Sequence, residues 1–525
     1  MHRVLIADQL SPAAEAIFRE RDIEVVTRVG LKPAELVAII GEFDGLAVRS
    51  ATKVTAEVLD AGHRLKVVGR AGIGVDNIDV EAATQRGIVV MNTPFGNSVT
   101  TAEHAISLML ATARQIPAAD RSTRAGKWEK SRFMGVELTG KVLGLIGCGN
   151  IGSIVADRAQ GLKMRVIGYD PFLSAERALD LGIEKVELDT LLQRADFISL
   201  HTPLTEQTRN ILSRDALMRT KPGVRVVNCA RGGLVDEQAV ADLTRDGHIA
   251  GAAFDVFAVE PARESPLFDL DEVVVTPHLG ASTSEAQENV ALHVAEQIAD
   301  YLATGAIVNA LNMPAVTPEE APRLRPFMKL AEQLGSFAGQ LTVEGLSAVT
   351  ISFAGHVASM NTRPLTQAAL AGLLRPHLPS VNMVNAPTVA NQRDIDVRVI
   401  TSEHLRDYQV LVTVEVVTER GPRSVAGTLF QDNEPRLVSI RGIPVEARLG
   451  AHMLYVRNKD RPGLIGALGK TLGDAQINIA TFHLGRERPG GDAIALVEVD
   501  GPIPEKVLAE VCRLPHVLHA KQLSF

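Results

Sequence analysis

Residues 142–152 read VLGLIGCGNIG, an apolar run that ends in three glycines spaced G-x-G-x-x-G. The run predicts a buried strand, and the apolar residues at roughly helical spacing after Gly152 predict a helix. Glycines permit a tight turn and let the backbone approach a pyrophosphate, while the helix N-terminus offers unpaired N–H groups and the positive end of a dipole. The stretch predicts a nucleotide-binding turn in a parallel α/β sheet, although the glycines alone leave a purely structural turn open.

The next strand adds a feature that favours a nucleotide site. Residues 166–170 read VIGYD, so Asp170 ends the strand 18 residues after Gly152. A carboxylate at this spacing can accept hydrogen bonds from the ribose hydroxyls of adenosine, and it would repel a 2′-phosphate. The pattern therefore favours NAD over NADP. The alternative is that Asp170 only caps the turn at Pro171.

Alternating elements extend in both directions from this unit. Apolar runs alternate with amphipathic segments over residues 4–92 and again over 142–275, which predicts two doubly wound parallel sheets covered by helices. Between them a helix is expected over 98–115, with a kink or restart at Pro117. A further helix over 284–303 should return the chain to the first unit. The expected domains are a flavodoxin-like substrate-binding domain (1–97 and 285–313) and a Rossmann NAD-binding domain (98–284).

The C-terminal part predicts smaller α+β regulatory domains. Residues 314–326 contain four prolines and two glutamates, a composition typical of a linker. Residues 317–450 contain strand-like runs without a motif of recognisable chemistry, and we expect an intervening regulatory domain there. Residues 452–525 show the order βαββαβ, which is typical of a ferredoxin-like domain.

Composition and charge exclude several classes of protein. The net charge of −8 comes without a basic block, which argues against nucleic acid and membrane surfaces as partners and favours small molecules. The apolar runs are too short to span a bilayer, and the N-terminus does not resemble a signal sequence. The three cysteines lack metal-ligand spacing, so no metal site is expected, and a reducing cytoplasm fits.

Three side chains near the ends of later strands form a candidate catalytic set. His278 can accept the hydroxyl proton when an alcohol is oxidised by hydride transfer, and Glu260 can favour its imidazolium form. Arg231 can hold a substrate carboxylate with its planar fork. Each has a plainer alternative, namely a packing histidine, a loop acid and a surface ion pair. Their joint position beyond a nucleotide loop favours catalysis.

Residues 1–313 resemble the D-isomer-specific 2-hydroxyacid dehydrogenases. The resemblance rests on the nucleotide loop, on Asn228–Gly232 (NCARG), on Asp255–Phe257 (DVF) with Glu260–Pro261, and on Pro277–Gly280 (PHLG). It implies catalysis by Arg231, Glu260 and His278. It also implies an NAD site formed by Gly147, Gly149, Asn150, Ile151, Gly152, Asp170, Thr202, Cys229, Ala230, Arg231, Asp255, His278, Gly280 and Ala281.

Two further stretches, residues 69–77 and 92–98, resemble the branch of that family that oxidises D-3-phosphoglycerate. This implies a substrate site at Arg49, Arg70 and Asn97, with Lys130, which follows the sole tryptophan, reaching across a subunit boundary. A phosphate-bearing substrate needs basic groups, although Arg49 and Lys130 would also fit as exposed charges.

The tail resembles an ACT regulatory domain through the loop 458–463 (NKDRPG). The resemblance implies that Asn458, Asp460 and Asn478 bind a small amino acid, with L-serine as the expected effector, and that this binding gives allosteric feedback on serine biosynthesis. Carboxylate and amide groups suit such a zwitterion. The alternative is a module that only dimerises.

Together these features predict a cytoplasmic, NAD-dependent homo-oligomer, expected to be a tetramer. Two other functions remain open. A glyoxylate or hydroxypyruvate reductase would share residues 1–313 but would have little use for an amino-acid-sensing tail. A non-catalytic NAD-sensing scaffold would not need Arg231, Glu260 and His278.

Overall fold

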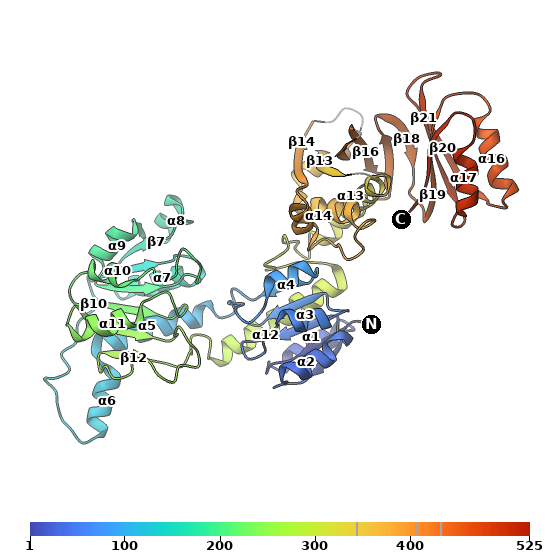
Figure 1. Ribbon diagram of the computed structural model, residues 1–525. Coiled ribbons are helices and arrows are strands. Elements are labelled where there is room, and N and C mark those ends of the chain that lie inside the picture. The colour runs from blue at the N-terminus through green and yellow to red at the C-terminus, as the bar shows by residue number, and fades with distance from the viewer. Residues whose placement is uncertain (343–344, 405–407, 420, 431–432) are drawn as a thin grey trace.

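The computed structural model describes residues 1–342, 345–404, 408–419, 421–430 and 433–525. Figure 1 shows two α/β units at the N-terminal end of the chain, followed by two α+β units. The prediction of two parallel-sheet domains followed by α+β domains, the last of them ferredoxin-like, is confirmed. No helix among the described residues is long and apolar enough to cross a bilayer.

The first unit is a five-stranded parallel sheet in the order β2-β1-β3-β4-β5, which is the flavodoxin-like order. Helix α12 packs against it, and Gly69 permits this contact because a Cβ atom there would lie 2.6 Å from the side chains of Val294 and Ile298. Its strands are β1 (Arg3–Ile6), β2 (Glu24–Thr27), β3 (Gly45–Val48), β4 (Val67–Arg70) and β5 (Val89–Asn92). Its helices are α1 (Ala13–Glu20), α2 (Pro33–Ile39), α3 (Ala56–Ala61), α4 (Val80–Gln85) and α12 (Ser284–Thr304).

The second unit is a seven-stranded parallel sheet in the order β12-β11-β10-β9-β6-β7-β8. The strand order reverses between β6 and β9, which is the switch point where such sheets bind dinucleotides. Its strands are β6 (Val142–Ile146), β7 (Arg165–Tyr169), β8 (Glu184–Lys185), β9 (Phe197–Leu200), β10 (Val224–Asn228), β11 (Ile249–Phe254) and β12 (Val273–Val275). Its helices are α5 (Ser98–Arg114), α6 (Ile116–Arg124), α7 (Asn150–Gly161), α8 (Ala175–Asp180), α9 (Leu188–Arg194), α10 (Arg214–Met218) and α11 (Glu237–Arg245).

The third unit is a six-stranded mixed sheet, β14-β13-β15-β16-β17-β18, with two tightly packed helices, α13 and α14. The two helices approach closely because Gly335 and Gly339 in α13 and Gly372 in α14 have no Cβ atom. A Cβ atom at any of these positions would collide with the backbone of the facing helix. Its strands are β13 (Leu346–Gly355), β14 (Asp396–Ser402), β15 (Val410–Thr418), β16 (Gly421–Leu429), β17 (Pro435–Ile440) and β18 (Ile443–Ala447). Its helices are α13 (Ala321–Leu341), α14 (Thr362–Leu374) and α15 (Ala386–Gln392).

The prediction of a linker over residues 314–326 is wrong in its second half, because α13 begins at Ala321. Pro322 lies in the first turn, where a missing N–H costs no helical hydrogen bond. Pro326 lies inside the helix, where proline is normally unfavourable. The close packing of α13 on α14 outweighs that local preference.

The last unit is an antiparallel sheet in the order β20-β21-β19-β22, with both helices packed against it. Its elements are β19 (His452–Lys459), α16 (Leu464–Asp474), β20 (Ile479–Arg486), β21 (Asp492–Val499), α17 (Glu505–Cys512) and β22 (Val517–Ser524). Strand β20 runs parallel to β19, with β21 between them, since both pair antiparallel with β21.

Candidate active site

The glycine turn after β6 has the geometry that a dinucleotide site requires. Gly147 adopts a φ of +95°, which favours glycine, and a Cβ atom there would lie 2.5 Å from the carbonyl oxygen of His201. A Cβ atom at Gly152 would lie 2.2 Å from the carbonyl oxygen of Gly147. Gly149, by contrast, faces open space at the N-cap of α7. Because the first-turn amides of a helix have no acceptor within the helix, this open space suits a pyrophosphate.

Asp170 braces the same turn. One carboxylate oxygen accepts a hydrogen bond from the backbone N–H of Cys148 at 2.9 Å. The other accepts the backbone N–H of Phe172 at 2.8 Å and so caps the turn at Pro171. The capping contact considered as the alternative is therefore present. Binding of the ribose remains a prediction, and it would use the carboxylate that already positions the glycine turn.

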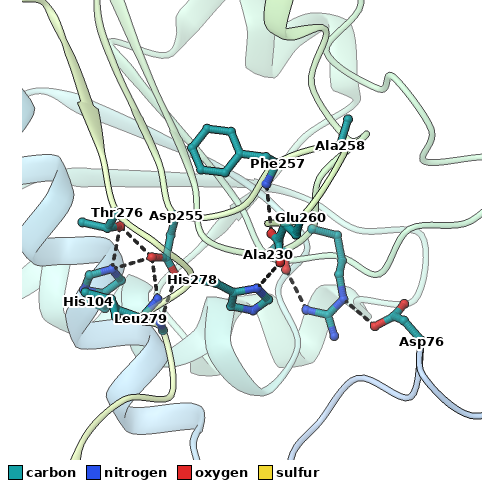
Figure 2. Close-up of polar contacts among 12 residues, drawn as sticks. Asp76, His104, Ala230, Asp255, Phe257, Ala258, Glu260, Thr276, His278 and Leu279 are labelled. Carbon is teal, nitrogen blue, oxygen red and sulfur yellow. Dashed lines mark hydrogen bonds and ion pairs between the residues drawn. The ribbon is translucent and has the colours of Figure 1, made fainter. Parts of the chain in front are cut away.

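His278 and Glu260 form the hydrogen-bonded pair shown in Figure 2. The Nδ1 atom of His278 lies 2.7 Å from one carboxylate oxygen of Glu260, whose other oxygen accepts the backbone N–H of Phe257 at 3.0 Å. The hydrogen bond to Glu260 raises the pKa of His278 above its ordinary value, against the opposing effect of burial. Burial also opposes ionisation of Glu260, but the contacts with His278 and Phe257 hold its pKa below the ordinary value. Half of the His278 side chain is exposed, which leaves the ring accessible to a substrate.

Asp255 holds the segment that carries His278. Its side chain is fully buried, and its oxygens accept hydrogen bonds from the backbone N–H groups of Leu279 at 2.7 Å and Gly280 at 2.8 Å, and from the Thr276 hydroxyl at 2.6 Å. Its backbone oxygen accepts the N–H of His278 at 2.9 Å. The carboxylate predicted to contact NAD thus fixes residues 276–280 from within the protein.

Arg231 reaches across from the second unit to the first. Its Nη1 donates to the carbonyl oxygen of Ala230 at 2.7 Å, and its Nε lies 3.2 Å from Asp76 (Figure 2). Arg70 lies in the same region, where burial, together with repulsion from Arg231 and Arg49, lowers its pKa to about 10. Three guanidinium groups therefore gather with Asp76 and Asp8 as nearby acids, and their excess positive charge suits an anion.

Among the residues predicted to bind substrate, two buried polar atoms have no hydrogen-bond partner in the described part of the chain, namely Nε of Arg70 and Oδ1 of Asn97. Buried polar atoms are normally paired, so these two atoms mark their surroundings as a candidate binding site. Nη1 of Arg49 lies 3.4 Å from the carbonyl oxygen of Gln9, and no acid among the described residues forms an ion pair with this head group. Arg49 and Arg70 thus lie near Arg231, while Asn97 is buried at the N-cap of α5.

Lys130 does not join them. It lies in the exposed loop after α6, next to Trp128, whose side chain is 87% exposed. Figure 1 shows α6 and this loop projecting from the second unit. The side chain borders a surface cavity with Arg114 and Glu137 rather than the arginine cluster. A role in the active site would require a second copy of the chain, as the predicted reach across a subunit boundary implies.

The predicted effector residues are not brought together in one chain. Asp460 accepts hydrogen bonds from Arg486 and from the backbone N–H of Gly490, both at 3.0 Å, at the end of β20. Asn478 precedes the start of β20 and donates to Asp500 at 2.8 Å. Asn458 is buried beside Asp460, and its Oδ1 has no partner in the described residues. Because β20 runs parallel to β19, its full length separates Asn478 from the other two.

Sequence reasoning missed three residues at the active site. Asp76 lies within the stretch 69–77 that carries the family resemblance, but its pairing with Arg231 had no local signal. The side chains of His104 and Thr101 extend from α5 to Asp255 and Gly280. The helical periodicity of the sequence does not distinguish these two positions from ordinary core or surface positions. Only proximity in the folded chain identifies them.

Comparison with known families divides the chain into similar parts. Residues 106–280 match the D-isomer specific 2-hydroxyacid dehydrogenase NAD binding domain. Residues 323–441 match the D-3-phosphoglycerate dehydrogenase intervening domain, and residues 452–516 match the ACT domain.

Full-length relatives are similar along the whole chain. A D-3-phosphoglycerate dehydrogenase of Synechocystis is 42% identical over 522 residues, which cover 99% of this chain and 94% of the relative. One of Bacillus subtilis is 39% identical over 525 residues, which cover all of both chains. Among solved structures, a Thermus thermophilus protein superposes with a TM-score of 0.55 at 36% identity, covering 59% of this chain and 99% of its own. A Paecilomyes thermophila glyoxylate reductase superposes with a TM-score of 0.55 at 28% identity, covering 59% of this chain and 98% of its own.

Proposed function

This chain belongs to the D-3-phosphoglycerate dehydrogenases, and on that premise we propose how its residues oxidise D-3-phosphoglycerate to 3-phosphohydroxypyruvate with NAD, the first step of L-serine biosynthesis. The similarity extends through the intervening and ACT domains, which a glyoxylate or hydroxypyruvate reductase would not need. A non-catalytic scaffold would not need the hydrogen-bonded pair of His278 and Glu260.

The contact between His278 and Glu260 carries the mechanism. A carboxylate 2.7 Å from Nδ1 favours the tautomer with a proton on Nδ1, so Nε2 keeps a lone pair that can accept a proton. His278 Nε2 takes the proton of the C2 hydroxyl as the C2 hydrogen leaves as hydride and the carbon–oxygen double bond forms. NAD supplies the hydride acceptor when it is bound. Glu260 stabilises the imidazolium that results.

The arginine cluster binds the substrate at both ends. Arg231 pairs with the carboxylate next to C2 and orients that carbon for transfer. Arg49 and Arg70 take the phosphate, and the side-chain amide nitrogen of Asn97 donates a hydrogen bond to the substrate. The residues of the glycine turn and of the strand ends named from the sequence hold NAD, with the pyrophosphate at the N-terminus of α7.

Replacement of Glu260 with glutamine should shift the pH dependence of oxidation. Oxidation needs neutral His278, so its rate falls as the pH drops through the pKa of His278. Glu260 raises that pKa, and its loss should move this acid limb to lower pH. Reduction of 3-phosphohydroxypyruvate needs the imidazolium and should weaken near neutral pH in the same variant. Profiles of kcat/KM in both directions test this, and an unmoved acid limb would contradict the proposed pair.

Replacement of Arg49 with alanine should raise KM for D-3-phosphoglycerate about tenfold or more, because it removes a charged contact to the phosphate. NADH absorbance measures turnover of D-3-phosphoglycerate and of D-glycerate, which lacks the phosphate and should respond far less. Lys53→Ala removes a nearby exposed cation and serves as the control. Turnover of D-glycerate but not of D-3-phosphoglycerate by the unaltered enzyme would contradict the substrate assignment.

The same assay with L-serine present tests the effector assignment.

Regulation and assembly follow from the remaining residues. We assign L-serine to Asn458, Asp460 and Asn478, with the last supplied by a second copy of the chain, because one chain separates it from the others by the length of β20. Lys130 likewise serves the active site of a second copy. Both assignments require a homo-oligomer, for which we propose a tetramer in the cytoplasm. We keep the domain boundaries expected from the sequence, with the intervening domain over residues 317–450.

A further inference from the structure

His104 is a polar residue of α5 that the mechanism does not use. Its side chain nevertheless contacts Asp255 and residues 276–280, which carry His278. Its Nε2 atom lies 3.2 Å from the Asp255 carboxylate and 3.3 Å from the hydroxyl of Thr276. The side chain is 19% exposed. Figure 2 shows His104, Thr276 and Leu279 gathered around Asp255, with His278 on the chain between the last two.

Asp255 requires its donors because its carboxylate is fully buried. A buried charge is costly unless hydrogen bonds compensate it. Burial opposes its ionisation, but the hydrogen bonds from His104 and Thr276, with that from the Leu279 amide, hold the pKa of Asp255 below its ordinary value. Removal of His104 would leave the carboxylate one donor short, and the remaining donors belong to the segment that positions His278.

A second contact joins α5 to the same segment. The hydroxyl of Thr101, one helical turn before His104, lies 2.8 Å from the carbonyl oxygen of Gly280 and 2.9 Å from that of Asn97, and it can donate its single proton to either. Thr101 is buried. A Cβ atom added at Gly280 would lie 3.4 Å from the methyl carbon of Thr101, so the two residues are in close contact. The helix thus holds residues 276–280 through Asp255 at one end and directly at the other.

Helix α5 also connects the two α/β units. It begins at Ser98, directly after the first unit, and packs against β10, β11 and β12 of the second unit. The Thr100 hydroxyl lies 3.2 Å from that of Thr283, the N-cap of the returning helix α12. Helix α5 thus contacts the start of α12 as well as residues 276–280.

We propose that His104, together with Thr101, is a positioning residue that couples the connecting helix α5 to the placement of the His278 imidazole. This inference rests on the proposed function, in which His278 is the base. His104 touches neither substrate nor NAD in this account. It acts by fixing Asp255, which fixes the backbone on both sides of His278, and so keeps the imidazole at hydrogen-bond distance from Glu260.

The charged groups around the His278 imidazole determine how a change at His104 would alter the pH profile of oxidation. His278 faces Glu260 directly, and Asp255 and Arg231 act on it from a greater distance with opposite signs. Asp255 itself faces His104 and lies near the buried thiol of Cys229. The contact with Glu260 has the largest effect on the pKa of His278 and raises it. Loosening of residues 276–280 would weaken this contact and should therefore lower that pKa.

The test compares His104→Leu with His104→Gln. Leucine fills similar space without a donor, while the glutamine amide can place an N–H near the position of Nε2. In the full-length enzyme, we expect kcat for oxidation to fall about 10- to 100-fold in His104→Leu, because small misplacement of a catalytic group has effects of that order. The acid limb of the pH profile should move to lower pH, and KM for D-3-phosphoglycerate should stay within about threefold. Glutamine should restore most of the rate and the profile.

Thr112→Val is the matched control, since Thr112 is buried in the same helix and its hydroxyl donates only to Leu108 in that helix. Thr101→Val provides a second variant should the leucine protein fail to fold, and its kcat should fall with the same pH shift. If His104→Leu and Thr101→Val keep the wild-type pH profile, or lose no more activity than Thr112→Val, the inference is overturned. His278→Ala in the same assay keeps the outcomes apart, because retained activity there would instead contradict the proposed function.

Discussion

Replacement of His278 with alanine should lower kcat for oxidation of D-3-phosphoglycerate by on the order of 10³-fold or more. In the proposed mechanism the Nε2 atom of this imidazole accepts the hydroxyl proton, and Glu260 faces the opposite ring nitrogen, so Glu260 cannot take over the role without moving. Binding of NAD should persist, since the glycine turn and Asp170 are independent of this ring. Turnover is measured from NADH absorbance, and NAD affinity by calorimetry.

The interpretation of that result depends on two comparisons. His63→Ala removes an exposed histidine of the first unit and should leave kcat unchanged. His278→Asn keeps a polar side chain without a base of suitable pKa and should be as inactive as alanine. Rates within tenfold of wild type in both His278 variants would eliminate His278 as the base and, with it, the proposed mechanism.

Replacement of Arg231 with lysine should lower kcat/KM for D-3-phosphoglycerate by about 10²-fold or more, even though the charge is kept. The guanidinium already contacts Ala230 through Nη1 and Asp76 through Nε, which holds its plane in one orientation. A planar fork held in this way can pair with a carboxylate through two hydrogen bonds. The lysine ammonium group is a single point and cannot make these contacts together.

Arg124→Lys is the matched control for this variant. Arg124 pairs with Asp120 on the exposed surface of α6, where exchange of the two cations should have little effect on activity. If Arg231→Lys retains kcat/KM within a few-fold of wild type, Arg231 does not hold the carboxylate, and Arg70 would be the next candidate from the same cluster.

The pair of His278 and Glu260 and the glycine turn could be predicted from the sequence because each has a local signature. The glycines of residues 147–152 are required by backbone conformation and by close approach, which the G-x-G-x-x-G spacing encodes directly. His278 and Glu260 both follow strands of the same parallel sheet, and such strands end at one edge. Their contact at 2.7 Å agrees with that prediction, while the proton transfer assigned to them awaits the experiments above.

The sequence by itself determined the order of elements, the class of both parallel sheets and the ferredoxin-like end, because apolar periodicity and glycine spacing act over a few neighbouring residues. Only the tertiary structure decided the pairing of Arg231 with Asp76, the reach of His104 to Asp255 and the separation of Asn478 from Asp460. The tertiary structure also decided that α13 continues through Pro326. Each of these depends on packing or register between segments distant in the chain, and no local pattern encodes which side chains then meet.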